Sequence, residues 1–474
     1  MIRNSCDEYM KIFNSLSGKK ESLPPPSKKP LRLFVCGPTV YDLSHIGHGR
    51  TYIFFDIFVR YLKSLGYKVF YLQNITDVDD KIIARAKEKN MPPLALANEL
   101  TEKHFRDMKT LGISSVTKYA PATRFIPQIV RQVQTLIRKG YAYEIPNDGY
   151  YYDISKFKDY GKLSRRTVEQ AEDAVSRIDE SVKKRNKGDF CLWKFSRTGE
   201  PSWPFDKLRA KLGRPGWHIE DTAITNHYFG PRYELHGGGL DLKFPHHEAE
   251  IAQAEAASGK KPLAKIWTHV GMLTVSGQKM SKSLHNFITI QNFLKNHSAD
   301  VLRLIVAGSL YRSPMDYTES LALDAERTLS GITEFLAKIR HLVNSKIKNQ
   351  KSKSQIKIQK YEKELNRAME DDLNTPEALA AIFGLINDVN KVIWNLSKAQ
   401  AQTAEKWLKS RLQIFGIKLE TPKIPSKIKV LVARRELLRS NKQFARSDTL
   451  RKKIDELGYR VEDTPRGPLV LKKN

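Results

Sequence analysis

The chain has few cysteines, a shortage of acidic residues and no long apolar run. Only three cysteines, Cys6, Cys36 and Cys191, occur in 474 residues, which excludes a disulfide framework and favours a reducing compartment. No stretch approaches the roughly 20 apolar residues of a membrane-spanning helix, and the N-terminal sequence MIRNSCDEYMKIF lacks the apolar core of a secretory signal. We therefore expect a cytoplasmic protein with no membrane partner.

The charge balance is strongly basic. There are 81 Lys and Arg residues against 52 Asp and Glu residues, a net charge of +29. Such an excess favours a polyanionic partner, because each phosphate contact releases a condensed counterion. A solvated basic surface explains the same charge, so charge alone does not decide between the two. The length and a hydrophobic fraction of 40% predict two to four packed domains.

The first regular pattern is a strand, helix and strand between residues 31 and 76. LRLFVCG (31–37) is a compact apolar run ended by Gly-Pro, typical of a buried parallel strand. Residues 51–66 place apolar side chains at helical spacing, and 67–76 form a second apolar strand. This order predicts a βαβ unit, whose connecting loop is where nucleotides usually bind.

Two short motifs carry the candidate phosphate chemistry. In HIGH, Gly47 lets the backbone approach a phosphate or adenine, and His45 and His48 can donate hydrogen bonds to charge developing on an α-phosphate. In KMSKS, Lys279 and Lys282 stand at i, i+3 on a serine-flanked segment that could hold a leaving pyrophosphate. Either motif alone is weak, since surface histidines and solvated lysines are common. Both together, in this order after a βαβ unit, resemble the class I aminoacyl-tRNA synthetases.

A third pattern is a dispersed group of metal-ligating side chains. Cys36 stands at the end of the first predicted strand, and His246 and Glu250 are i, i+4 and project from one helical face. A thiolate, an imidazole and a carboxylate together suit zinc. On spacing alone another interpretation stays open, in which His246 or His247 caps the helix and Glu250 is a surface acid.

The resemblance extends further, to the cysteinyl-tRNA synthetases. The blocks CGPTVYDLSHIGHGRTY, NITDVDDKI, DFCLWK, GRPGWHIE, HGGGLDLKFPHHEAEIAQ, KMSKSLHNF and MEDDLNTPEAL occur in the family's order, and the match runs from Leu31 onward. It implies ATP-dependent activation of L-cysteine, with Mg²⁺ accompanying ATP, and transfer to the 3′ end of tRNA(Cys). It also implies a monomer.

The resemblance implies a zinc ion at the amino-acid pocket, held by two cysteines, a histidine and a glutamate. Cys36, His246 and Glu250 match this set, but Asp221 stands where the second cysteine is expected. Aspartate can ligate zinc through oxygen, so we hypothesise that zinc is retained with Asp221 as a ligand. In the alternatives, Asp221 caps a helix beginning at the next residue, Cys191 substitutes, or Asp221 changes the amino acid accepted.

The same resemblance implies roles for further residues. Thr76 and Trp217 would be walls of the cysteine pocket, although plain core packing would also explain the tryptophan. The segment HGGGLD would contact the adenosine and ribose. The predicted phosphate and ATP contacts are His45, Gly47, His48, His236, Gly238, Asp241, Lys279 and Lys282.

We predict an α/β fold: a Rossmann-like parallel-sheet catalytic domain with an inserted subdomain, then an α-helical bundle and a small C-terminal α+β unit. The predicted parts are an N-terminal extension (1–30), a first catalytic half (31–121), a connective insertion (122–215), a second catalytic half with the zinc helix (216–299), a helical stem-contact and anticodon-binding region of DALR type (300–421) and a basic tRNA-binding unit (422–474). From Lys418 onward 16 basic residues face 7 acidic ones, and Phe444, Arg446 and Tyr459 are of the kind that stack on unpaired bases.

Two competing functions remain at this point. A related cysteine ligase that acts on an amino sugar would share the adenylation site, but it would resemble the family only in the catalytic part. The basic C-terminal region argues against it. A non-catalytic RNA-binding relative is the second candidate, and the intact HIGH and KMSKS motifs argue against that one.

Overall fold

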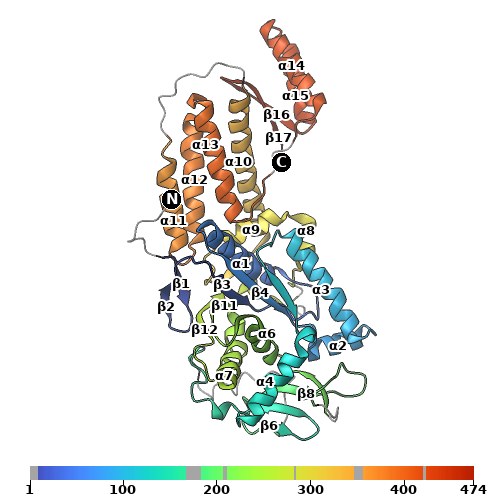
Figure 1. The fold of residues 1–474 in the computed structure, drawn as a ribbon. Helices are drawn as coiled ribbons and strands as arrows, with labels where there is room; N and C mark the ends of the chain where they lie inside the picture. The colour runs from blue at the N-terminus through green and yellow to red at the C-terminus, as the bar shows by residue number, and fades with distance from the viewer. Residues whose placement is uncertain are drawn as a thin grey trace. The chain divides into compact units, whose positions relative to one another are not determined.

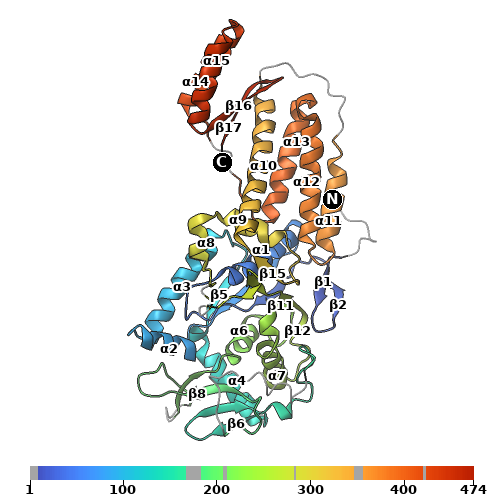
Figure 2. The same cartoon turned by 180° about the vertical axis from the view of Figure 1, so that it is seen from behind.

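The computed structural model describes residues 9–166, 183–206, 211–281, 284, 286–345, 356–419 and 423–473. The chain divides into two compact units (Figures 1 and 2). The first comprises Met1–Ala299, Ser309–Tyr317 and Glu370–Leu373, and the second comprises Asp300–Gly308, Thr318–Met369 and Asn374–Asn474. Among the described helices, none combines the length and the apolarity needed to cross a bilayer.

A parallel five-stranded sheet forms the centre of the first unit. Its order is β12 (Ala264–Val270), β11 (Tyr233–Gly239), β3 (Leu31–Val35), β4 (Val69–Ile75) and β5 (Lys118–Pro121). The predicted βαβ unit is confirmed as β3, α1 (Ile46–Ser64) and β4, with the two strands paired in parallel. Its strands could be predicted because parallel strands are covered on both faces and so are apolar throughout.

Helix α1 begins five residues before the predicted start and includes most of the HIGH motif. His45 is its N-cap, and the imidazole Nδ1 accepts a hydrogen bond of 3.1 Å from the Gly47 N–H. Histidine is not among the common N-cap residues, which explains why the sequence pattern placed the start too late.

The two faces of the sheet are covered by different helices, as Figure 1 shows for α1 and for the pair α6 (Ile219–Phe229) and α7 (His246–Ser258). Strand β11 makes the arrangement explicit. A Cβ on Gly237 would lie 2.2 Å from Phe55 Cζ of α1, whereas a Cβ on the next residue, Gly238, would lie 3.0 Å from the His247 ring of α7. Alternate residues of β11 therefore face α1 and α7.

The predicted insertion contains a second sheet. It has the order β6 (Ala142–Ile145), β7 (Gly149–Tyr152), β8 (Phe190–Phe195), β10 (Leu212–Pro215) and β9 (Trp203–Pro204), with antiparallel pairing. Helix α4 (Ile126–Arg138) precedes it and packs against α6. The remaining elements of this unit are α2 (Asp80–Glu88), α3 (Pro93–Thr110), β13 (Leu273–Val275), β14 (Gln278–Lys279), α8 (Ile290–Asn296) and β15 (Met315–Tyr317).

The stretch predicted as an N-terminal extension contains a folded hairpin. Strands β1 (Lys11–Asn14) and β2 (Lys19–Ser22) pair antiparallel, and the hairpin is fixed to β12. The buried Asn14 accepts a hydrogen bond from the Trp267 N–H at 3.0 Å, and the Ser15 N–H donates to the Trp267 carbonyl at 2.8 Å. The first strand of this hairpin is only the four residues Lys11–Asn14, whose side chains alternate between partly buried and buried, before a Ser-Gly turn. Such a pattern is too short to predict a strand.

The second unit is helical, with a small α+β end. Its helices are α9 (Ala299–Ala307), α10 (Glu319–Asn344), α11 (Ile358–Glu370), α12 (Thr375–Val392), α13 (Lys398–Ile414), α14 (Ser426–Ser440) and α15 (Phe444–Glu456), and β16 (Tyr459–Thr464) and β17 (Gly467–Lys472) pair as a hairpin. The fully buried Arg303 donates to the Phe415 carbonyl at 2.8 Å. The predicted fold class is confirmed. Most of the Lys-rich run at 344–360 lies outside the described residues.

Candidate active site

The HIGH motif forms the first turn of α1, where two imidazoles stack. The His45 and His48 rings are 3.9 Å apart, and the His45 N–H donates to His48 Nδ1 at 3.4 Å. Burial lowers the pKa of His45 to about 4 and that of His48 well below its ordinary value. Both rings are therefore neutral at pH 7, so each can donate one hydrogen bond to an anionic ligand.

The segment after KMSKS lies against this turn. The Ile46 N–H donates to the Ile288 carbonyl at 3.1 Å, and the Phe287 ring meets the His45 ring edge-on at 5.2 Å. A Cβ on Gly47 would lie 3.4 Å from Met280 Cε, so the two motifs are in contact. Lys279 is exposed at the end of β14. Lys282 lies outside the described residues.

Four buried side chains from three segments meet in a second group. Cys36 follows β3, Asp221 is in the first turn of α6, and His246 and Glu250 are one turn apart on α7. Their ligand atoms all lie within 4.8 Å of one another. His246 Nε2 is 3.0 Å from an oxygen of each carboxylate. The sequence placed these residues in one group from spacing and resemblance, and the fold brings them together.

The electrostatics of this group fit a bound cation. Burial and then Glu250 and Asp221 raise the pKa of the Cys36 thiol. Burial lowers the pKa of His246, but the same two carboxylates raise it to a net value of about 9. Oδ1 of Asp221 and Oε2 of Glu250 are buried without a hydrogen-bond partner among the described residues. Sulfur, nitrogen and two carboxylates with unused oxygens suit zinc.

Two interpretations left open by the sequence are wrong. Helix α6 begins at Ile219 with His218 as its N-cap, so Asp221 lies inside the helix and does not cap it. Helix α7 has Pro245 as its N-cap with no side-chain capping bond, so neither histidine caps it. Cys191 lies in β8 and is not among the described residues that are close enough together to hold a metal ion.

The predicted walls of the cysteine pocket, Thr76 and Trp217, each contact a residue in or next to the metal group. The Trp217 indole stacks on the His246 ring at 4.3 Å and lines a cavity of about 90 Å³ with Thr39 and Lys81. Because this indole is only partly buried and faces a cavity, plain core packing does not describe it. Thr76 is buried, and its hydroxyl donates to the Glu220 carboxyl.

The HGGGLD segment divides between the interior and the surface. The His236 side chain is fully buried, with Nε2 3.5 Å from Cys36 Sγ, so it lies beside the metal group. Gly238 faces the same side, toward His247, and Asp241 is exposed just after the strand. The nucleotide role of all three residues stays a prediction.

Comparison with known proteins places this geometry in a family. Residues 23–327 match the family model described as the class I (C) tRNA synthetase catalytic domain, and residues 364–420 match the DALR domain. The chain belongs to the class I (C) tRNA synthetases. A relative in Thermoplasma volcanium, "Cysteine--tRNA ligase", is 40% identical over 96% of this chain and 98% of its own length. Another of the same name in Persephonella marina is 39% identical over 98% of this chain and 100% of its own.

Solved structures agree on the fold of this tRNA synthetase. Mycobacterium tuberculosis methionyl-tRNA synthetase in complex with methionyl-adenylate has a TM-score of 0.59 and 15% identity, covering 82% of this chain and 90% of that one. A ternary complex of Agrobacterium radiobacter LeuRS with tRNA and LeuAMS has a TM-score of 0.62 and 12% identity, covering 83% and 84%.

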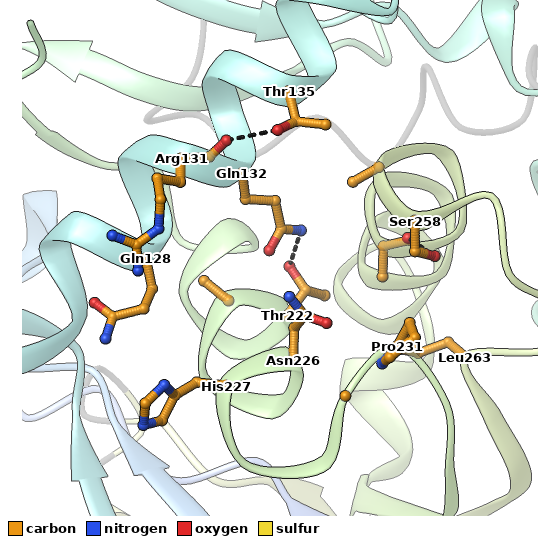
Figure 3. Close-up of a pocket in the computed structure, with 14 residues that line it drawn as sticks. Gln128, Arg131, Gln132, Thr135, Thr222, Asn226, His227, Pro231, Ser258 and Leu263 are labelled. Carbon is orange, nitrogen blue, oxygen red and sulfur yellow. Dashed lines mark hydrogen bonds between the residues drawn. The ribbon is translucent and has the colours of Figure 1, made fainter.

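The structure also has features that the motifs did not reveal. A cavity of about 330 Å³ lies between α4, α6 and α7. The Thr222 hydroxyl there accepts a hydrogen bond of 2.9 Å from Gln132 (Figure 3). This cavity is lined by residues outside the HIGH and KMSKS motifs. Four histidines were also missed as neighbours of the metal group: His218, His236, His247 and His269. Strand alternation could have indicated His236, and the sequence does not show that the other three meet this group.

Proposed function

We propose that the chain is a cysteine--tRNA ligase, which activates L-cysteine with ATP and transfers it to the 3′ end of tRNA(Cys) in the cytoplasm. The observation that carries the proposal is that three features lie at the carboxyl end of the parallel sheet. The HIGH turn of α1 contacts the KMSKS segment, and the buried Cys36, Asp221, His246 and Glu250 form the metal group.

In the first step, a carboxylate oxygen of cysteine attacks the α-phosphorus of ATP, which enters with Mg²⁺. A new P–O bond forms, the bond to the β-phosphate oxygen breaks, and pyrophosphate leaves. His45 and His48 are neutral and stacked at a helix N-terminus, where they can donate to the α-phosphate oxygens as charge develops. Lys279 with Lys282 would hold the leaving pyrophosphate.

In the second step, a terminal ribose hydroxyl of the tRNA attacks the acyl carbon and AMP leaves. No covalent bond to the enzyme is required, so catalysis depends on orientation and charge stabilisation. The basic region that contains α14 and α15 would contact the tRNA, and the exposed Phe444 is suited to stacking on an unpaired base.

The metal group would supply the choice of cysteine over serine. Zinc held by Cys36, Asp221, His246 and Glu250 would bind a thiolate side chain far better than a hydroxyl. Asp221 in place of the family's cysteine gives a harder ligand set with weaker zinc affinity. The Trp217 indole, stacked on His246, would cover the bound side chain.

One pair of assays tests the proposal. Pyrophosphate exchange with cysteine and with serine measures the first step, and charging of tRNA measures the second. We expect exchange with cysteine to exceed that with serine by more than about tenfold, because a thiolate is a far better zinc ligand than a hydroxyl. Exchange without tRNA charging would indicate a ligase with another acceptor, and the absence of exchange would contradict the proposal. Zinc analysis of protein purified without chelator completes the test, with about one equivalent expected.

A further inference from the structure

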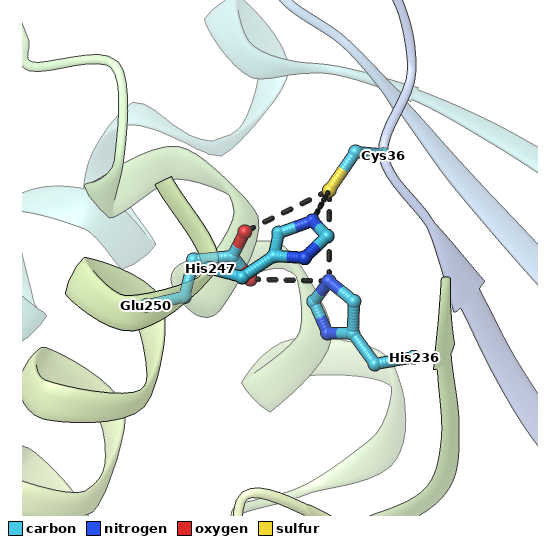
Figure 4. Close-up of side chains that lie close together, drawn as sticks. All are labelled: Cys36, His236, His247 and Glu250. Carbon is cyan, nitrogen blue, oxygen red and sulfur yellow. Dashed lines mark hydrogen bonds and ion pairs between the residues drawn. The ribbon is translucent and has the colours of Figure 1, made fainter. Parts of the chain in front are cut away.

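A second group of four ligands overlaps the first. Figure 4 shows Cys36, His236, His247 and Glu250 pointing toward one another from the end of β3, from β11 and from α7. Their ligand atoms also lie within 4.8 Å of one another, and all four side chains are 0–4% exposed. The two groups share Cys36 and Glu250. Asp221 and His246 complete the first group, and His236 and His247 complete the second, which we call the histidine-rich set.

The distances within this histidine-rich set fit one tetrahedral ion. Zinc bonds are about 2.3 Å to sulfur and about 2.0–2.1 Å to nitrogen or oxygen. In a tetrahedral site the sulfur is then roughly 3.5 Å from each nitrogen or oxygen ligand, and the nitrogen and oxygen ligands are roughly 3.3 Å from one another. Cys36 Sγ lies 3.5 Å from His236 Nε2 and 3.1 Å from His247 Nε2. His236 Nε2 lies 3.5 Å from Glu250 Oε2.

The second nitrogen of each imidazole is already held by a neighbour. His236 Nδ1 is 2.7 Å from the Tyr233 hydroxyl, and His247 Nδ1 is 2.9 Å from His269 Nε2. His269 Nδ1 is in turn 2.8 Å from the Ser15 hydroxyl of the N-terminal hairpin. Such outer hydrogen bonds fix the ring and direct Nε2 at a metal, as in known metal sites.

Glu250 can serve both sets because its two oxygens point in different directions. Oε1 is 3.0 Å from His246 Nε2 in the first set, and Oε2 is 3.5 Å from His236 Nε2 in the second. The second set uses no residue of α6, the helix that bears Asp221. Loss of Asp221 therefore leaves the second set complete.

We propose that the histidine-rich set is a second zinc position, and that it holds the ion when Asp221 does not. The inference rests on the proposed function for the first position. When the ion moves to the second position, His236 and His247 replace Asp221 and His246 as ligands. The Cys36 thiolate is kept, and zinc gains a second neutral imidazole ligand. Because Asp221 supplies a carboxylate where the family has a thiolate, the first set binds zinc less tightly. The zinc affinities of the two positions are therefore closer to each other.

The test removes one set at a time in the full-length protein. Asp221→Ala disables the first set, His247→Ala the second, and Cys36→Ala both. Zinc per chain is measured after dialysis, and X-ray absorption at the zinc edge counts the imidazole ligands. We expect about one zinc in the first two variants and less than about 0.1 in Cys36→Ala and in the double variant Asp221→Ala/His247→Ala. Asp221→Ala should show two imidazoles.

Loss of zinc from Asp221→Ala to the level of Cys36→Ala overturns the inference, as does retained zinc with one imidazole. If Asp221→Ala does not fold, as judged by its thermal melt, His246→Ala disables the first set from α7 and carries the same expectation. Wild-type protein without zinc also overturns the inference. Cysteine-dependent pyrophosphate exchange of that same protein separately decides the proposed function.

Discussion

Arg50 links the HIGH helix to the loop between β12 and β13, which precedes the KMSKS segment, and to the residues just before β15. The side chain is 2% exposed, and its guanidinium donates to the carbonyls of Gly271, Met272 and Ser313 at 2.8, 2.6 and 2.5 Å. Two longer contacts of 3.4 Å reach Leu310 and Tyr311. Burial lowers the pKa of Arg50 to about 10, so the group remains charged at neutral pH.

The cost of losing these bonds follows from their number. A hydrogen bond from a charged donor contributes about 1.5–3 kcal/mol net, and a buried carbonyl left without a donor costs a similar amount. Arg50→Met keeps the apolar stem but removes all three short bonds, so we expect a loss of about 5 kcal/mol in unfolding free energy. Arg50→Lys keeps the charge but cannot reproduce the planar fork, and about 2–3 kcal/mol should be lost.

Thermal melts and pyrophosphate exchange measure the two consequences. Arg50→Met should melt far below wild type and lose most exchange, because the HIGH turn is no longer held to the KMSKS side. Arg50→Lys should lie between the two. Lys103→Met removes an exposed i, i+4 pair with Glu99 on α3 and serves as a control, which should melt close to wild type. An Arg50→Met protein that melts like this control and retains full exchange would refute the reasoning.

Two glycine substitutions should change stability in opposite directions, and one histidine should make stability depend on pH. Gly237→Ala places a Cβ 2.2 Å from Phe55 Cζ and should destabilise by about 1–3 kcal/mol, whereas Gly331→Ala, on an open face of α10, should stabilise by about 0.5–1 kcal/mol; equal melting temperatures would contradict both. Burial lowers the pKa of His104 to about 4, so the unfolded chain takes up the proton first. The contribution of His104 to the unfolding free energy should therefore fall by about 2 kcal/mol between pH 7.5 and 5. His104→Gln should lack that part of the pH dependence in urea unfolding.

The central sheet was predictable because its signal is local. Strands β3 and β4 are apolar runs, as burial on both faces requires. The start of α1 was not predictable from the same rules, because His45 caps it through an imidazole. The hairpin β1–β2 depends on Asn14, whose side chain bonds a residue 253 positions away. Local pattern carries no information on such a contact.

The site was predicted in part for the same reason. The i, i+4 spacing of His246 and Glu250 places both on one face of α7. The neighbouring His247 looks equivalent in sequence, and only the fold shows that it meets Cys36 Sγ from another direction, at 3.1 Å. The direction of His236 could have been inferred from strand alternation, since Gly237 must face α1 closely.

Because the two ligand sets overlap, the shared residues matter more for zinc binding than the unshared ones. Asp221 and His246 belong to one set, and His236 and His247 belong to the other. A change at any of these four positions leaves a complete alternative, provided that the shared ligands remain. Cys36 and Glu250 complete both sets, so either substitution removes every four-ligand arrangement among the described residues. Loss of the ligand at position 221 is therefore tolerable on physical grounds, whereas loss of the ligand at position 36 or 250 is not.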